Sequence, residues 1–212
     1  MRSNPDLVLE RQLQKEGFAS IAGLDEAGRG AWAGPLTAAA VILPLERPDL
    51  AEILHGVRDS KQMTPAQRGR WAGAIREIAV AVGVGHCLPG EVDDLGPLVA
   101  TRLAMERALA GLSLVPEHLL IDYLRLPEVS LPQTGLPQGD ARVLSIAAAS
   151  VIAKVTRDQW MVSLEEAYPG YGFARHKGYG TPEHRGALAL LGPCPLHRMS
   201  FAPVASLPLF PH

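Results

Sequence analysis

Four acidic residues occupy positions where a β-sheet would bring them together. Asp25 and Glu26 follow one short apolar run, Asp122 follows another, and Asp140 precedes a long helical segment. Carboxylates at the ends of buried strands are costly unless they are paired or bind a cation. Clustered carboxylates suit Mg²⁺ or Mn²⁺, and two such ions can promote hydrolysis of a phosphodiester. The pattern therefore indicates metal-assisted hydrolytic chemistry.

Taken singly, these acids have simpler explanations. Asp25 and Glu26 also fit a surface turn, and Asp140 fits an acid stabilised by a helix dipole. Neighbours on a strand point to opposite faces, so Asp25 and Glu26 share one site only if the chain leaves strand geometry at Glu26. Gly28 and Gly30 offer such a departure because glycine tolerates unusual dihedral angles.

Two other arrangements could carry chemistry. Cys194 and His197 have the spacing of a metal-ligand pair, but no second pair accompanies them, which favours a structural or loop role. Ser150 and Lys154 are four residues apart on an expected helix. A Ser–Lys hydrolase places its lysine three residues on and needs further motifs that are absent here.

The elements that must position these residues alternate between strands and helices. Apolar runs predict strands over 18–24, 36–43, 79–86 and 119–122. Helical patterns cover 6–16, 64–78, 98–112, 143–166 and 181–191. Residues 123–139 are rich in Pro and Gly and are expected to form a loop or an edge strand. Strands precede helices repeatedly, which predicts an α/β fold with a mixed sheet.

Composition indicates a globular protein. The chain has 212 residues, of which 47% are hydrophobic and 20% charged, which suits one domain or one domain with a small appendage. The longest uncharged run, Gly30–Leu45, has 16 residues and two prolines, whereas a membrane span needs about 20. The charged N-terminus lacks a secretory signal. With only Cys87 and Cys194 present, a reducing cytoplasm is the expected location.

Charge is distributed unevenly. The net charge is −2, and the pI of about 6.4 lacks the usual basic footprint of a nucleic-acid binder. Residues 1–140 carry 13 basic and 18 acidic side chains, a net of −5, whereas residues 141–212 carry 7 basic and 4 acidic ones, a net of +3. A near-neutral total thus conceals a basic C-terminal part, which fits either a solvated surface or one that binds phosphate.

The segment Ala22–Gly30, which reads Ala-Gly-Leu-Asp-Glu-Ala-Gly-Arg-Gly, resembles the signature of ribonuclease HII, the type 2 ribonuclease H family. Further stretches match the same family in order, and together they extend from about residue 18 to 203. They are Asp59–Lys61, Gly139–Asp140, Ser145–Lys154, Val155–Asp158, His176–Thr181 with His184, and Gly192–Phe201. The combination is highly specific, although no single stretch is.

The resemblance implies a ribonuclease H-like mixed sheet flanked by helices, with a helical C-terminal extension. It implies one catalytic domain over 1–212, with a core at about 17–160, a helical part at about 161–203 and a tail at 204–212. The family's metal-binding carboxylates fall on the four acids described above, and two Mg²⁺ or Mn²⁺ ions are expected. The implied activity is cleavage of RNA in RNA–DNA hybrids and incision 5′ to single ribonucleotides in duplex DNA, leaving 3′-hydroxyl and 5′-phosphate ends.

The family's ribose-reading motif falls on Gly28, Arg29 and Gly30. A 2′-hydroxyl both donates and accepts hydrogen bonds, and close backbone approach suits its recognition. Arg29 alone would also fit a plain phosphate contact. Tyr179 matches the tyrosine that packs at the RNA–DNA junction, although outside the motif a core or surface tyrosine would be the simpler interpretation.

Three lysines in matching motifs, Lys61, Lys154 and Lys177, are candidates for phosphate contact, and Lys154 is equally compatible with a structural role. Two positions depart from the common pattern. Tyr123 stands where Gly often follows the aspartate, and Gln138 stands where a basic residue is frequent. These changes affect the expected loop shape and one phosphate contact.

The tail Ser206–Phe210 resembles the short apolar peptide that docks on sliding clamps, with Leu207–Phe210 as its hydrophobic part, but the upstream glutamine is missing. An ordinary tail is the alternative. The resemblance implies a monomer without membrane association. Three rivals remain: a type 3 enzyme with an extra N-terminal domain, an inert hybrid-binding protein, and a junction resolvase of the same fold.

Overall fold

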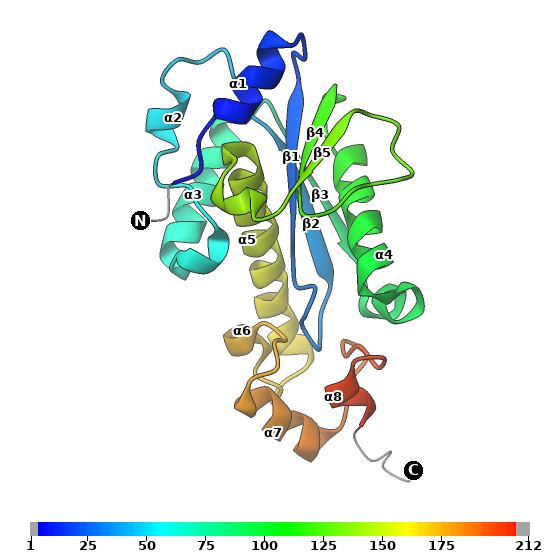
Figure 1. Ribbon diagram of the computed structural model, residues 1–212. Helices are drawn as coiled ribbons and strands as arrows, with labels where there is room; N and C mark the ends of the chain where they lie inside the picture. Colours follow the sequence, from blue (N-terminus) through cyan, green and yellow to red (C-terminus); the bar gives the residue numbers. More distant parts are fainter. Residues whose placement is uncertain (1–3, 207–212) are drawn as a thin grey trace.

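The computed structural model describes residues 4–206 and is built around a five-stranded sheet in the order β3-β2-β1-β4-β5 (Figure 1). Its strands are β1 Ile21–Ala27, β2 Leu36–Ile42, β3 Ala81–Cys87, β4 His118–Asp122 and β5 Gln133–Leu136. The β1–β2 and β2–β3 pairs are antiparallel, whereas β1–β4 and β4–β5 are parallel. The predicted α/β fold with a mixed sheet is confirmed, and the edge strand expected within 123–139 is β5.

The helices are α1 Val8–Lys15, α2 Leu50–Ile53, α3 Pro65–Ile78, α4 Pro89–Ala110, α5 Leu144–Ala167, α6 Phe173–His176, α7 Pro182–Leu191 and α8 Ala202–Ala205. Two 3₁₀ turns, η1 Ser60–Gln62 and η2 Gly139–Ala141, lie between them. Thr64 caps α3 and forms a capping box with Gln67, which explains why that helix starts where its sequence indicates. Helix α4 begins nine residues before the expected 98, because a non-helical break at Gly96 and the following Pro97 interrupt its pattern.

Helices cover both faces of the sheet (Figure 1). Helix α4 packs on one face over β2 and β3, and α5 packs on the other over β1 and β2, with α3 against α5. Gly23 of β1 allows this close packing, since a Cβ there would lie 2.2 Å from the carbonyl carbon of Ser145. Any larger residue at position 23 would push α5 away from the central strand.

A small C-terminal part, α6 to α8, lies beyond the end of the sheet and is joined to it by α5 (Figure 1). It has its own apolar cluster around Met161, Tyr171 and Phe173. Helix α5 runs unbroken through residue 160, where the core was expected to end. Within residues 4–206, no helix is long and apolar enough to cross a membrane.

Candidate active site

Three of the four predicted acids meet beside the carboxyl ends of β4 and β5. The parallel pairing of β1 with β4 ends at Leu24 opposite Ile121, so the next residues, Asp25 and Asp122, lie side by side. Asp140 belongs to η2, which follows β5, and the preceding Gly139 donates its N–H to Asp122 Oδ1 at 2.7 Å. Asp25 within β1, Asp122 at the end of β4 and Asp140 after β5 thus lie together at one end of the sheet.

Glu26 reaches the same region by a different route from the expected one. The chain keeps strand geometry at Glu26, where a departure was the condition for sharing a site with Asp25, because Glu26 pairs with Ala38 and Ala27 pairs with Thr37. The strand ends at Gly28, whose φ is +87°. Glu26 therefore projects from the opposite face to Asp25, yet it borders the same cavity because β4 has already ended at Asp122.

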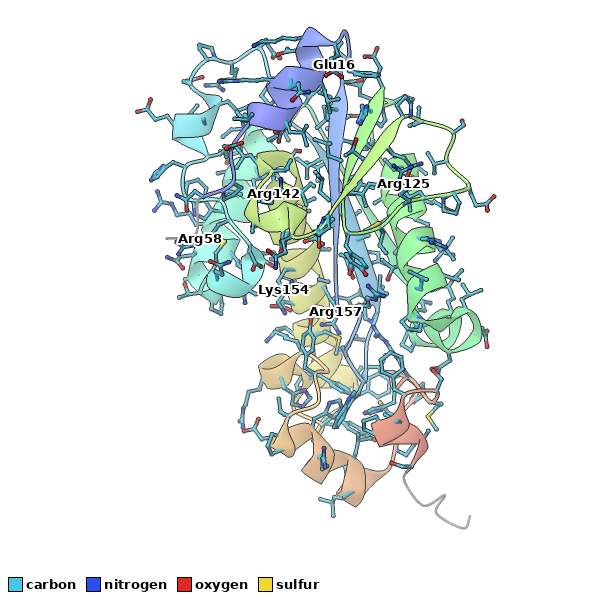
Figure 2. All side chains as sticks on the ribbon, in the orientation of Figure 1. Glu16, Arg58, Arg125, Arg142, Lys154 and Arg157 are labelled. Carbon is cyan, nitrogen blue, oxygen red and sulfur yellow. The ribbon has the colours of Figure 1, made fainter. Side chains whose placement is uncertain are left out.

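An open cavity of about 770 Å³ lies over this edge of the sheet. Its ionisable lining residues are of both signs: Glu26, Asp59, Asp122 and Asp140, with Arg29, Arg58, Lys61 and Arg142. Asp25 is only 4% exposed and lies beneath them. Figure 2 shows Arg58 and Arg142 on the α5 side of the sheet. A cavity with acids at its base and cations around them suits the binding of a polyanion, one phosphate of which would approach a metal site.

Sequence reasoning missed Asp59. It interacts electrostatically with both Asp122 and Asp140, and its Oδ1 also accepts the Lys61 N–H at 2.9 Å. The signal that could have identified it was its place in the Asp59–Lys61 motif, two residues before a lysine expected at the site. Asp59 therefore adds negative charge to the cluster.

The pKa values of all four predicted acids are raised. Burial holds the pKa of Asp25 well above its usual range, with the charges of Glu26 and Asp122 adding to it. Burial likewise raises the pKa of Glu26, against the opposing charge of Arg29, and that of Asp122, against the Gly139 N–H. The pKa of Asp140 rises to about 6 through burial and the charge of Asp122. The cluster thus carries more negative charge than its surroundings neutralise.

The donor chemistry fits hard divalent cations. The oxygens of Asp25 and Asp122 are held by backbone N–H groups, with Glu26 N donating to Asp25 Oδ1 at 2.7 Å. Across residues 4–206, no three Asp, Glu, His or Cys side chains are yet arranged as a closed ligand set. Carboxylates crowded enough to raise each other's pKa are stabilised by Mg²⁺ or Mn²⁺, whose preferred ligands are such oxygens.

Lys61 belongs to this cluster. Its Nζ lies 3.8 Å from Asp140 Oδ2, and although burial opposes its charge, Asp25, Asp140 and Asp59 raise its pKa above the usual value. The neighbouring Ser60 Oγ lies 3.0 Å from Ser150 Oγ on α5. The turn that carries Lys61 is thereby fixed to the helix beneath the site.

Two glycines in the loop after β1, Gly28 and Gly30, differ in their surroundings. At Gly28, a Cβ would lie 2.0 Å from Arg157 Nε, and the positive φ also favours glycine. At Gly30, a Cβ would meet nothing within 4 Å. The N–H groups of Arg29 and Gly30 donate to no backbone acceptor among the loops and turns of residues 4–206. Packing within the protein explains Gly28 but leaves Gly30 without a structural role.

Tyr179 lies between α5 and the loop after β1. Lys154 Nζ is 4.9 Å and Arg157 Cζ is 5.1 Å from its ring centroid. Lys154 also pairs with Asp158 at 2.8 Å, and Lys177 Nζ donates to the Ala174 carbonyl. Figure 2 shows Lys154 and Arg157 along α5 between the sheet edge and the C-terminal part. Lys61 thus lines the acidic cavity, whereas Lys154 and Lys177 lie near Tyr179.

Cys194 and His197 belong to a chain of hydrogen bonds. His184 Nδ1 donates to the Tyr179 carbonyl at 3.0 Å, which leaves its Nε2 as the acceptor from His197 Nε2, also at 3.0 Å. His197 Nδ1 then accepts the Cys194 N–H at 2.9 Å. Burial lowers the pKa of both histidines to about 4. These neutral rings favour the structural role expected for Cys194 and His197.

The chain is similar to known proteins over nearly its whole length. The family model described as Ribonuclease HII matches residues 22–204. A Ribonuclease HII from Chloroflexus aurantiacus is 54% identical over 203 residues, which cover 94% of each chain.

Two solved structures have the same fold. The ribonuclease H2 of Pyrococcus horikoshii OT3 has a TM-score of 0.71 and 27% identity over 88% of this chain and 95% of its own. The structure of the PCNA:RNase HII complex from Archaeoglobus fulgidus has a TM-score of 0.70 and 28% identity over 85% of this chain and 94% of that one.

Proposed function

The chain belongs to the ribonuclease HII family and is therefore a ribonuclease H, an endonuclease acting on RNA–DNA hybrids; from this premise we propose that it also incises duplex DNA 5′ to a single embedded ribonucleotide. The products would be 3′-hydroxyl and 5′-phosphate ends. The observation that carries the proposal is the carboxylate cluster of Asp25, Glu26, Asp122 and Asp140, next to a loop with two N–H groups that bond to no backbone acceptor in the described part of the chain, 4–206.

The four carboxylates are proposed to hold two divalent ions. When bound, these ions supply the Lewis-acid chemistry that activates a water and stabilises the departing 3′ oxygen. Asp25, the most buried of the four, would supply oxygen ligands to the ions together with Glu26, Asp122 and Asp140. Lys61, beside Asp140, would contact phosphate at the cavity edge.

Ribose selection is assigned to Gly28, Arg29 and Gly30. Two observations support a backbone that approaches a 2′-hydroxyl closely: the open space at Gly30, and the N–H groups of Arg29 and Gly30, which have no backbone acceptor within the described residues 4–206. Tyr179 would pack against the next sugar. Lys154 and Lys177, close to Tyr179, are proposed to contact the flanking phosphates.

The decisive experiment uses a DNA duplex that carries one ribonucleotide, with Mg²⁺ or Mn²⁺. The wild type should cut 5′ to the ribonucleotide and leave the all-DNA duplex intact. Asp25→Asn should fold normally and lose cleavage, whereas Asp49→Asn, at an exposed surface pair, should retain it. Full activity in Asp25→Asn would refute the assignment, and cutting of plain DNA would favour a junction resolvase.

Partner binding is a separate proposal. Leu207–Phe210 lies outside the residues that the structure describes, and the A. fulgidus relative was solved as a complex with PCNA. We propose that this tail docks on a sliding clamp, because its sequence resembles the short apolar peptides that bind such clamps. A pull-down in which deletion of Leu207–Phe210 leaves clamp binding unchanged would remove the proposal. The monomeric state and the cytoplasmic location also remain predictions.

A further inference from the structure

Two arginines are completely buried between the loop after β1 and the C-terminal part. Arg157 on α5 and Arg198 before α8 are both 0% exposed. Neither forms an ion pair with a carboxylate within residues 4–206. Burial lowers the pKa of Arg198 only to about 10, so it stays charged at neutral pH.

All the hydrogen bonds of these guanidinium groups go to backbone carbonyls. Arg198 Nη1 donates to the Arg29 carbonyl at 3.0 Å, and its Nε and Nη2 donate to the Gly34 carbonyl at 3.2 and 2.9 Å. Arg157 donates to Ala33 and Pro35 at 3.0 and 2.8 Å. The two buried guanidinium groups therefore hold the backbone of loop 28–35 through hydrogen bonds.

Arg157 also joins this loop to Tyr179. Its Nη1 donates to the Lys177 carbonyl at 2.9 Å, and its guanidinium lies 5.1 Å from the Tyr179 ring centroid. The loop backbone adds direct bonds, since the Trp32 N–H donates to the Gly178 carbonyl at 2.9 Å. One guanidinium thus contacts both segments that are proposed to read the ribonucleotide.

Such an arrangement is expensive for the fold alone. A buried charge without an ionic partner costs several kcal/mol of desolvation, which hydrogen bonds to carbonyls offset only in part. A planar guanidinium, however, holds several carbonyls in one fixed geometry, which a lysine does not. The stability cost points to a requirement for geometry at the loop.

We propose that Arg157 and Arg198 are positioning residues, which hold the Gly28–Gly30 loop and Tyr179 in one geometry and thereby set selection for a ribonucleotide over a deoxyribonucleotide. This inference rests on the proposed function of the loop. Neither arginine touches the substrate, and both act through the backbone that they hold.

The test measures binding rather than turnover. Affinity is determined in Ca²⁺ for two duplexes that differ only by one 2′-hydroxyl. In Arg198→Lys, the preference of the wild type for the ribonucleotide duplex should fall about tenfold, the effect of losing a charge-assisted hydrogen bond. Affinity for all-DNA duplex should stay unchanged. Arg47→Lys, which alters an arginine in an exposed surface pair with Asp49, is the matched control.

The outcomes distinguish ribose reading by the loop from the positioning role of the two arginines. A wild type that does not distinguish the duplexes refutes ribose reading by the loop. A wild type that does, together with a folded Arg198→Lys of unchanged preference, overturns the positioning role. If Arg198→Lys does not fold, Arg157→Lys is measured in the same way.

Hydrogen exchange of the wild type gives an independent check without any variant. The amides of Trp32, Ala33 and Gly34 should be protected in the free protein, because each is bonded to the C-terminal part. Exchange of these amides at the rate of an open loop would also overturn the proposal.

Discussion

Acid should destabilise this protein through the buried pair His184 and His197. The pair is bonded as two neutral rings, and a proton on either would set two N–H groups against each other. Burial lowers both pKa values from 6.5 to about 4. Between these values the folded state binds fewer protons than the unfolded state. The stabilisation is therefore complete above pH 6.5 and is lost as pH falls toward 4.

The magnitude follows from the two pKa values. A histidine with pKa 6.5 unfolded and about 4 folded contributes roughly 2 kcal/mol less stability at pH 5 than at pH 7. Both rings are almost fully buried, at 0% and 2% exposed, so solvent screens them little. The pair then accounts for up to about 4 kcal/mol, a large share of a typical free energy of unfolding of roughly 5–15 kcal/mol.

The acids of the cavity act in the opposite direction over the same range. Their raised pKa values mean that the folded state takes up protons more readily, so Asp25, Asp122 and Asp140 favour folding as pH falls. A pH titration of the wild type alone therefore mixes the two effects. Comparison with a histidine variant removes the shared contribution of the acids.

The assay is urea unfolding at pH 7, 6 and 5 for the wild type and His184→Asn. The asparagine can still donate to the Tyr179 carbonyl, but the variant should be less stable at pH 7 because ring volume is lost. Between pH 7 and 5 it should lose about 2 kcal/mol less than the wild type. His55→Asn, at an exposed site, should follow the wild type. A His184→Asn protein with the wild-type pH dependence would refute the neutral-pair reasoning.

Three further predictions concern the cavity. Asp140→Asn should raise the unfolding free energy of the metal-free protein at pH 8 by about 1 kcal/mol, because it removes repulsion, while cleavage is lost; a lower melting temperature would contradict this. Tyr123 is 69% exposed and has a φ of +61°. Tyr123→Asn should therefore stabilise the folded protein by about 1 kcal/mol in urea unfolding, and an unchanged midpoint would count against backbone strain. Binding of uncleavable hybrid should weaken with salt, with a log–log slope of about −3 to −4 if all four cavity cations contact phosphate; a flat salt profile would exclude them.

The sequence predicted the sheet and most of the long helices because their apolar periodicity is strong. The short helices α2, α6 and α8 were missed, since four residues are too few to show a period of 3.6. Helix α4 was predicted to start late because Gly96 and Pro97 read as a helix boundary, although the structure continues through them with a kink.

The positions of the candidate acids could be predicted from the sequence, but those of the residues that hold the neighbouring loop could not. Asp25 and Asp122 end apolar runs, so their position at a sheet edge follows from pattern. The strand geometry at Glu26 did not follow from the pattern, because the length of β1 depends on its pairing with β2 and not on local residues. Arg157 and Arg198 lie within recognised motifs, but an arginine in a helix or loop reads as exposed. Only the three-dimensional packing shows that they are buried.

The bonds of Arg198 also order events during synthesis. They close over 164 and 169 residues of chain, whereas the acids of the cavity are all present once residue 140 has emerged. A growing chain could therefore lock the loop after β1 only once Arg198 had emerged. Under the proposed function, ribose selection would be the last property that a growing chain acquires, and a chain that ends before Arg198 should lack it.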